Sequence, residues 1–159
     1  MSLQKRAEVS AEQIVARNRK ARHDYHIVET WEAGLVLTGT EIKSVRAGKV
    51  SLKGAFGLVR SGEIWLEGLN IAAYTSGGYT NHEPERPRKV LMRQRDIRRL
   101  IGALQQKGLT LVPLDMHFTK GWAKVTLGLG RGKKLHDKRE DVKQRDAARE
   151  AARAMGRRR

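Results

Sequence analysis

The sequence of 159 residues contains no cysteine, only three prolines and only 5% aromatic residues. Without cysteine, the chain cannot form disulfides, cysteine-based zinc clusters or a thiol nucleophile. No stretch approaches the roughly 18 consecutive apolar residues of a membrane-spanning helix, and residues 1–6 lack the hydrophobic segment of a signal peptide. We therefore expect a soluble protein of the cytoplasm.

Acidic residues are scarce as well. Lysine and arginine number 33 against 17 aspartates and glutamates, which gives a net charge of +16. Such an excess points to a polyanionic partner, with nucleic acid as the first candidate and an anionic membrane surface as the second. Residues 1–24 carry a net charge of +3, residues 25–130 of +6 and residues 131–159 of +7. The length suits one domain with appendages.

The first half of a predicted β-rich body, residues 25–74, reads as strands interrupted by one short helix. Apolar residues dominate 25–37 and predict a strand. Thr40 is placed to cap the helix that follows, and Gly48 is placed to end it. Further along, Ser61-Gly62 separates two short apolar runs, which predicts a hairpin with a glycine at positive φ.

The second half of the body holds the clearest helical pattern, over residues 93–107, with Gly108 as its predicted C-cap. A long loop over 75–89 precedes it, and a second hairpin over 109–130 turns at Lys120-Gly121. Many short strands with two or three helices predict an OB-like closed β-barrel, mainly β with flanking helices. The three tryptophans, Trp31, Trp65 and Trp122, are interpreted as core or rim packing residues, with base stacking as the alternative.

The two ends of the chain are interpreted separately from the body, residues 25–130. Residues 1–24 form a basic arm with a weak helix after Ser10. Residues 131–159 have few large apolar side chains, so we expect this tail to be disordered when free and helical when bound. Its predicted helix carries a basic ridge at helical spacing: Arg145, Arg149 and Arg153.

No motif in the chain indicates catalysis. The glycine run 128–134 is not a phosphate loop, because Leu127 and Lys134 occupy positions that require glycine and serine or threonine. His82-Glu83 precedes a proline and lacks a second histidine four residues on. His136-Asp137 reads from the residues alone as a solvated pair at a helix start, with base stacking by the imidazole as the functional alternative. We expect no metal, no cofactor and no enzyme activity.

Five segments resemble, in the same order, the SsrA-binding protein family (small protein B, SmpB), the bacterial partners of transfer-messenger RNA (tmRNA). They are NRKARHDY (18–25), EAGLVLTGTEIKSVR (32–46), PERPRKVL (84–91), TLVPL (110–114) and GRGKKLHDKR (130–139). His117 departs from the family, which more often has tyrosine there.

The resemblance implies an OB-like barrel that binds the tRNA-like domain of tmRNA near its elbow and D-loop. It also implies that the tail enters the empty mRNA channel and decoding centre of the small subunit, in place of a codon–anticodon helix. The predicted tmRNA contacts combine residues of the basic arm with those that the resemblance implies. They are Asn18, Arg19, Lys20, Arg22, His23, Tyr25, Glu32, Glu41, Lys43, Ser44, Arg46 and Lys124. The predicted ribosome contacts likewise combine residues that the resemblance implies with the three arginines of the basic ridge. They are Gly132, Lys133, Lys134, His136, Asp137, Lys138, Arg139, Arg145, Arg149 and Arg153.

The first hypothesis is therefore an RNA-binding cofactor of trans-translation, the rescue of stalled ribosomes. Its partners would be tmRNA, the 70S ribosome and small-subunit rRNA, with no membrane, and it would bind RNA as a monomer. An RNA-cleaving or RNA-modifying enzyme that uses His136 and Asp137 is one alternative, and it requires an acidic or metal cluster that the sequence does not offer. A generic OB-type translation or ribosomal protein is another.

Overall fold

Three long antiparallel strands organise the computed structural model: β2 (Tyr25–Leu35), β8 (Leu109–Thr119) and β9 (Trp122–Gly132). The structure describes residues 14–74, 81–133 and 135–157, with the backbone alone at 135–138, 140–142 and 154–157. The shorter strands are β1 (Ile14–Arg17), β3 (Val50–Ser51), β4 (Phe56–Arg60), β5 (Glu63–Glu67), β6 (Asn70–Ile71) and β7 (Arg88–Leu91). The helices are α2 (Arg19–Asp24), α3 (Gly39–Arg46), α4 (Gln94–Leu104) and α5 (Leu135–Arg157).

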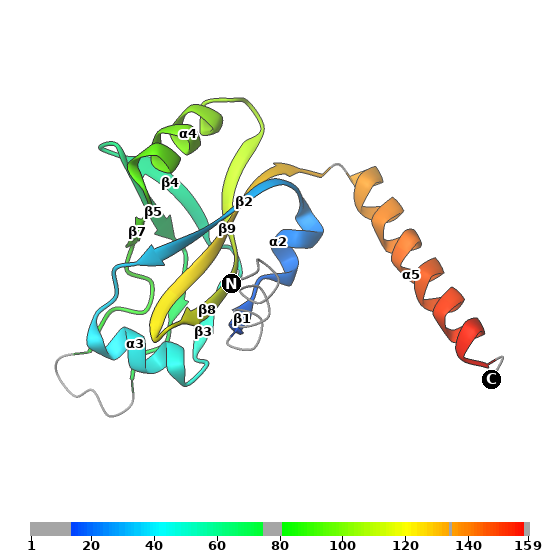
Figure 1. Ribbon diagram of the computed structural model, residues 1–159, viewed down its shortest axis with the longest axis horizontal. Coiled ribbons are helices and arrows are strands. Elements are labelled where there is room, and N and C mark those ends of the chain that lie inside the picture. Colours follow the sequence, from blue (N-terminus) through cyan, green and yellow to red (C-terminus); the bar gives the residue numbers. More distant parts are fainter. Residues whose placement is uncertain (1–13, 75–80, 134, 158–159) are drawn as a thin grey trace.

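The main sheet has seven strands in the order β1-β8-β4-β5-β7-β2-β9, and β9 also pairs with β8. The chain is thus mainly β with several helices, as Figure 1 shows. The two predicted hairpins are confirmed. Ser61 and Gly62 join β4 to β5 with φ of 52° and 73°, and Lys120 and Gly121 join β8 to β9 with φ of 49° and 80°. Positive φ at both central residues is the geometry that matches the twist of paired strands.

The hydrophobic core forms because alternate residues of these strands point to one side of the sheet. Along β9, Val125, Leu127 and Leu129 are buried, whereas Lys124 and Thr126, at alternate positions, are partly exposed. Helix α4 adds Leu100, which is fully buried, from its apolar stripe. The buried core cluster is Ala33, Leu35, Val45, Leu52, Ala55, Ile64, Leu66, Leu69, Ile71, Val90, Leu100, Leu111, Met116, Val125, Leu127 and Leu129.

Two predicted caps are wrong. Helix α3 begins after Thr38 rather than Thr40, because Thr38 and Glu41 form a reciprocal capping box. Gly48 does follow the C-cap of α3 with a φ of 74°. Helix α4 ends at Leu104 with Gln105 as its C-cap, so Gly108 lies beyond the helix, in the turn before β8.

The predicted boundaries between the arm, the body and the tail, at residues 24/25 and 130/131, do not coincide with the ends of the sheet in the structure. Residues 14–17 form β1, which pairs with β8, and α2 follows, so much of the predicted arm packs on the body. The last two residues of the predicted loop 75–89, Arg88 and Lys89, belong to strand β7 in the structure. Strand β9 runs on to Gly132, into the predicted tail. The weak helix expected after Ser10 lies outside the described residues.

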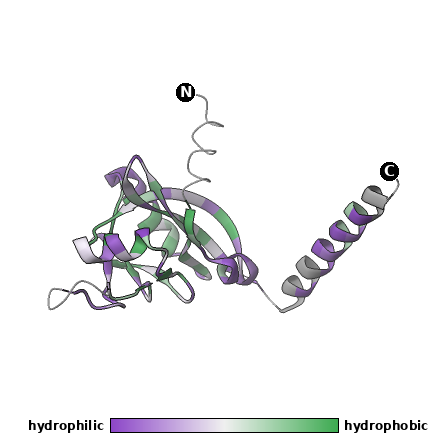
Figure 2. Ribbon diagram, turned by 90° about the horizontal axis from the view of Figure 1, so that it is seen from below, coloured by the Kyte–Doolittle hydropathy of each residue, from purple (hydrophilic) through white to green (hydrophobic). Residues whose placement is uncertain are grey.

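Helix α5 extends away from the sheet, as Figures 1 and 2 show from two directions. Its described residues are mostly hydrophilic in Figure 2, whereas hydrophobic residues concentrate in the body. The alanines at positions 147, 148, 151 and 152 of this helix are exposed. No helix in the described part of the chain is long and apolar enough to cross a bilayer.

Candidate nucleic-acid interface

The side of β2, β8 and β9 that faces away from the core carries a set of polar side chains, here called the polar face: Glu32, Asp115, His117, Lys124 and Thr126. Opposed residues of antiparallel strands project to the same side. Glu32 is opposite Thr126, which is opposite Asp115, and His117 is opposite Lys124. The register of three strands therefore assembles residues from positions 32 to 126 in one patch.

His117 is the centre of this patch and is only 3% exposed. Its Nδ1 lies 2.8 Å from Asp115 Oδ1 and its Nε2 lies 3.2 Å from Glu32 Oε2. Carboxylates only accept hydrogen bonds, so both ring nitrogens must carry a proton to satisfy both contacts. The geometry thus selects the imidazolium form, which donates to one carboxylate on β8 and to another on β2.

The pKa values around His117 agree with this geometry. The hydrogen bond to Asp115 raises the pKa of His117 above its ordinary value, burial opposes this, and Glu32 raises it further. Burial alone would raise the pKa of Asp115, but hydrogen bonds donated by His117 and Thr126 outweigh burial and lower it. Glu32, whose side chain is 47% exposed, is held on the polar face while still open to solvent.

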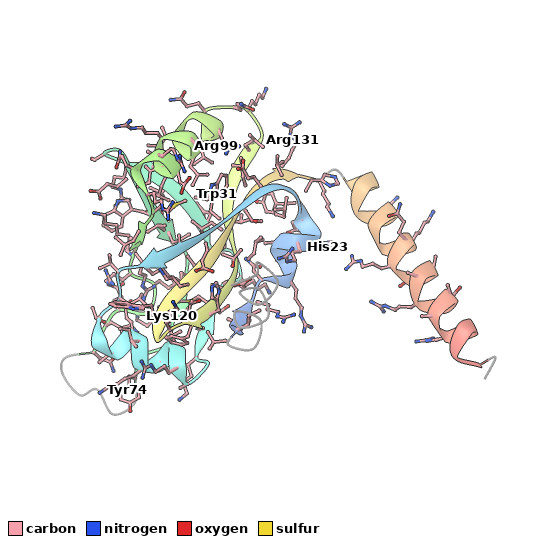
Figure 3. All side chains as sticks on the ribbon, in the orientation of Figure 1. His23, Trp31, Tyr74, Arg99, Lys120 and Arg131 are labelled. Carbon is pink, nitrogen blue, oxygen red and sulfur yellow. The ribbon has the colours of Figure 1, made fainter. Side chains whose placement is uncertain are left out.

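Helix α2 supplies a group of exposed cations at one end of the polar face. Arg19, Lys20 and Arg22 are exposed, and Arg17, Arg19 and Arg22 line a hollow that also reaches Asp115. His23 is half-buried with its Nδ1 3.0 Å from Asp24 Oδ1 (Figure 3). Here four of the predicted tmRNA contacts share one short helix.

Asn18 is different from its neighbours on α2, because it is only 5% exposed. Its Oδ1 accepts the N–H of Ala21, and its Nδ2 donates to the carbonyls of Leu52 and Pro113 at 3.1 and 2.9 Å. All of these bonds are internal, so the side chain caps α2 and ties it to two distant segments. The prediction that Asn18 contacts RNA is corrected: it positions α2.

Glu41 and Ser44 are also misassigned by the sequence prediction, because neither has any exposed surface. Glu41 pairs with Arg86 and Arg88, and Arg88 Nε lies 2.6 Å from Glu41 Oε2. Burial would raise the pKa of Glu41, but hydrogen bonds from Arg86, the Thr38 N–H and Arg88 lower it instead. Both α3 residues face the interior and cannot present atoms to an RNA.

The exposed side of α3 carries the other predicted contacts, Lys43 and Arg46. The Lys43 ammonium lies 5.4 Å from the centre of the Tyr74 ring, and the Arg46 guanidinium lies 5.6 Å from that of Phe118. Each cation is thus held over an aromatic face while it remains accessible. Tyr25 is half-buried at the start of β2, where its Cβ packs on Gly130.

The glycine run of β9 has a packing role. A Cβ at Gly128 would lie 2.9 Å from Leu114 Cδ1, and a Cβ at Gly130 would lie 2.9 Å from Tyr25 Cβ. These two glycines allow side chains of β8 and β2 to cross the strand closely. The run therefore belongs to the sheet, in agreement with the conclusion that it is not a phosphate loop.

The predicted ribosome contacts lie apart from the polar face. Gly132 ends β9 opposite Tyr25, and the Lys133 N–H donates to Asp24 O at 2.9 Å, so the start of the tail is anchored beside α2. Exposed arginines along α5 are Arg139, Arg145, Arg149 and Arg153. Lys134 and the side chains of His136, Asp137 and Lys138 lie outside the described residues.

The sequence prediction missed several residues that matter here. Trp122 was expected to pack but is 73% exposed, whereas Trp31 and Trp65 are half-buried as expected. Asp115 and His117 share a strand face at a spacing of two, a signal that was available once β8 had been predicted. Arg88 is fully buried, and only the fold reveals its partner. Within the described residues, no group of three or more His, Asp or Glu side chains is arranged to hold a metal ion.

Comparisons with known proteins agree on one family. The family model described as SmpB protein matches residues 15–157. The SsrA-binding protein of Acidothermus cellulolyticus is 55% identical over 152 residues, 96% of each chain, and that of Salinispora arenicola is 57% identical over 145 residues, 91% of each chain. A chain from the solved structure described as "tmRNA-SmpB: a journey to the center of the bacterial ribosome" is 53% identical with a TM-score of 0.66, over 80% of this chain and 93% of that one.

Proposed function

The chain belongs to the SmpB protein family, and we propose on that basis that it binds SsrA RNA (tmRNA) and delivers it to stalled ribosomes in trans-translation. The observation that carries this proposal is the match of the family model to residues 15–157, which includes both the body and the tail. Relatives named SsrA-binding protein, more than half identical over nearly the whole chain, support it. The net charge of +16 suits two RNA partners.

The body binds the tRNA-like domain of the RNA through the polar face and α2. Arg19, Lys20 and Arg22 offer cations to phosphates along one short helix, while the half-exposed Glu32 and Lys124 extend the contact across β2 and β9. The accessible members of the proposed contact set are Arg19, Lys20, Arg22, His23, Tyr25, Glu32, Lys43, Arg46 and Lys124.

The body has the architecture of an OB-like closed barrel. This proposal rests on the strand pairings: β8 pairs with β4 and with β9, and β9 pairs with β2, so the order of hydrogen-bonded strands returns to β8. Closure removes unpaired sheet edges, which suits a small body whose outside carries functional side chains. Figure 3 gives the arrangement of these side chains around the strands.

The tail acts on the ribosome. Helix α5 enters the empty mRNA channel and its start occupies the decoding centre in place of a codon–anticodon helix. The exposed arginines along α5 and its separation from the sheet support this role, because a helix with so little apolar surface gains little by docking on its own body. Although residues 135–157 are helical in the structure, the tail has too little apolar surface to keep this helix ordered in the free protein, and the small-subunit rRNA supplies the charges that order it. The proposed contacts at its start are Gly132, Lys133, Lys134, His136, Asp137, Lys138 and Arg139.

The protein has no catalytic activity of its own in this scheme and works in the cytoplasm, where stalled ribosomes are found. Capture of tagged protein from bacterial lysate, followed by sizing of the bound RNA, tests the scheme. Recovery of one dominant RNA of tmRNA size supports it. A broad mixture of RNAs with no tmRNA enrichment contradicts it, and favours a generic translation protein.

A further inference from the structure

Trp122 is the most exposed large hydrophobic residue that the structure describes, with 73% of its surface open to solvent. Trp31 and Trp65 each bury a good part of their rings against the body. In the described part of the chain, the Trp122 indole N–H has no hydrogen-bond partner. Tryptophan is on average a well-buried residue, because its large ring gains much from leaving water. An accessible tryptophan ring at this position therefore suggests contact with a binding partner.

The backbone beneath Trp122 is firmly placed. It is the first residue of β9, and it pairs with Thr119 directly across the β8–β9 hairpin. The two-residue turn at Lys120 and Gly121, with φ of 49° and 80°, is the shortest common connection between two antiparallel strands. A partner that contacts this ring meets a position that is already fixed, which reduces the ordering entropy lost on binding.

Trp122 lies on the same side of β9 as the polar face, because side chains two apart on a strand point the same way. Lys124 is its neighbour on that side. Gly34 of β2 is opposite Lys124. Val36, which follows the end of β2, is 44% exposed. The ring therefore continues the polar face to the hairpin tip and adds an apolar end to it.

The charges around the tip are positive. Lys120 lies in the turn, as Figure 3 shows, and Lys124 follows on β9. Among the described residues, neither lysine forms an ion pair with a carboxylate. A flat accessible ring between unpaired cations is the combination by which proteins hold unpaired nucleotides, with the ring against a base and the cations near phosphates.

We propose that Trp122 is a stacking platform for an unpaired base of SsrA RNA, with Lys120 and Lys124 close to the flanking phosphates. This rests on the proposed function and adds a site that reads an unstacked base. An apolar protein partner fits less well, because lysines are depleted from the buried centres of protein interfaces. Stacking tolerates any base, so the site selects for an unpaired nucleotide and not for a particular sequence.

The test is equilibrium binding of the full-length protein to SsrA RNA, for the wild type and for Trp122→Ala, Trp122→Leu and Trp122→Phe. Loss of base stacking weakens binding by about five- to 150-fold on removal of an aromatic ring. We expect Ala and Leu to fall in this range and Phe to stay near the wild type. Val59→Ala removes an exposed apolar side chain from β4, where it lines a hollow together with residues of α4. It is the control and should bind normally.

A fluorescence measurement gives a second readout. RNA that stacks on Trp122 should quench tryptophan emission of the wild type, and this quenching should be lost in Trp122→Phe although the RNA still binds. Unchanged thermal melting of the variants excludes misfolding as the cause. If Trp122→Leu binds as well as the wild type, or if Trp122→Ala loses no affinity, the stacking site is wrong. The proposed function fails separately, if the wild type itself does not bind SsrA RNA.

Discussion

Glu41 of α3 and Arg88 of β7 form an ion pair in which neither side chain has exposed surface, with Arg88 Nε 2.6 Å from Glu41 Oε2. Arg86 adds a second cation to the same carboxylate. Arg88 Nη1 also donates to the carbonyls of Leu69 and Pro84. The network joins α3, β7 and the segment before β7, and so sets the position of the helix that presents Lys43 and Arg46.

Replacement of Glu41 by Gln should strongly destabilise the fold. The change leaves the buried Arg88 charge without its counterion, and removal of one partner from a buried pair typically costs about 3–5 kcal/mol. Chemical denaturation measures this loss. Glu67→Gln is the matched control, because it breaks the exposed Arg60–Glu67 pair and should cost about 1 kcal/mol or less. A stable Glu41→Gln protein with weakened RNA binding would restore Glu41 as an RNA contact.

The pH dependence of stability should carry the signature of His117. Its pKa is raised in the fold, so the stability it contributes is complete below its ordinary value of 6.5 and is lost as pH rises through the folded-state pKa. The free energy of unfolding of the wild type should therefore fall over this window. His117→Gln should lose about 1.5–3 kcal/mol per charged hydrogen bond at low pH and show a flatter profile. Parallel profiles for the two proteins would show that His117 does not bridge the carboxylates.

Gly130 of β9 should not tolerate alanine. The new Cβ would lie 2.9 Å from Tyr25 Cβ, next to the backbone of β2 where a side-chain rotation gives no relief. Overpacking of this kind costs about 1–3 kcal/mol of unfolding free energy. Gly102→Ala in α4 meets no atom within 4 Å and should instead stabilise the helix by about 0.5–1 kcal/mol. Equal melting temperatures for the two variants would contradict this packing argument.

The arginines of α2 should contribute to SsrA RNA affinity through phosphates. Arg19→Ala and Arg22→Ala should each weaken binding and lower the slope of log affinity against log salt by about one. Arg95→Ala and Arg98→Ala remove equally exposed arginines from α4, which lies outside the proposed contact set, and should leave both quantities unchanged. An effect of the α4 pair as large as that of the α2 pair would move the interface away from α2.

Local patterns in the sequence were sufficient for much of the fold. The alternation along β9 and the turn residues at Ser61-Gly62 and Lys120-Gly121 predicted both hairpins, because strand period and positive φ are local properties. The stripe of α4 was equally clear. The end of α4 was not, since Gly108 resembles a C-cap although the helix ends at Leu104.

The interior polar residues could not be predicted from local pattern. Asn18, Glu41 and Ser44 look like surface polar residues beside basic neighbours, and their burial depends on partners up to 95 positions away, such as the Pro113 carbonyl that Asn18 contacts. Trp122 is the opposite case. A tryptophan is usually expected to pack in the interior, but Trp122 lies beside the turn of a hairpin, where few other side chains are available to cover it.

The central claim is a division of labour between a body that holds SsrA RNA and a tail that acts on the ribosome. A chain that ends at Lys133 keeps all of β9 and the bond from the Lys133 N–H to Asp24 O. Its affinity for SsrA RNA and its support of the rescue of stalled ribosomes should be measured side by side with those of the full-length chain. The account predicts unchanged affinity with rescue abolished. Loss of RNA binding in the shortened chain, or full rescue without the tail, would contradict it.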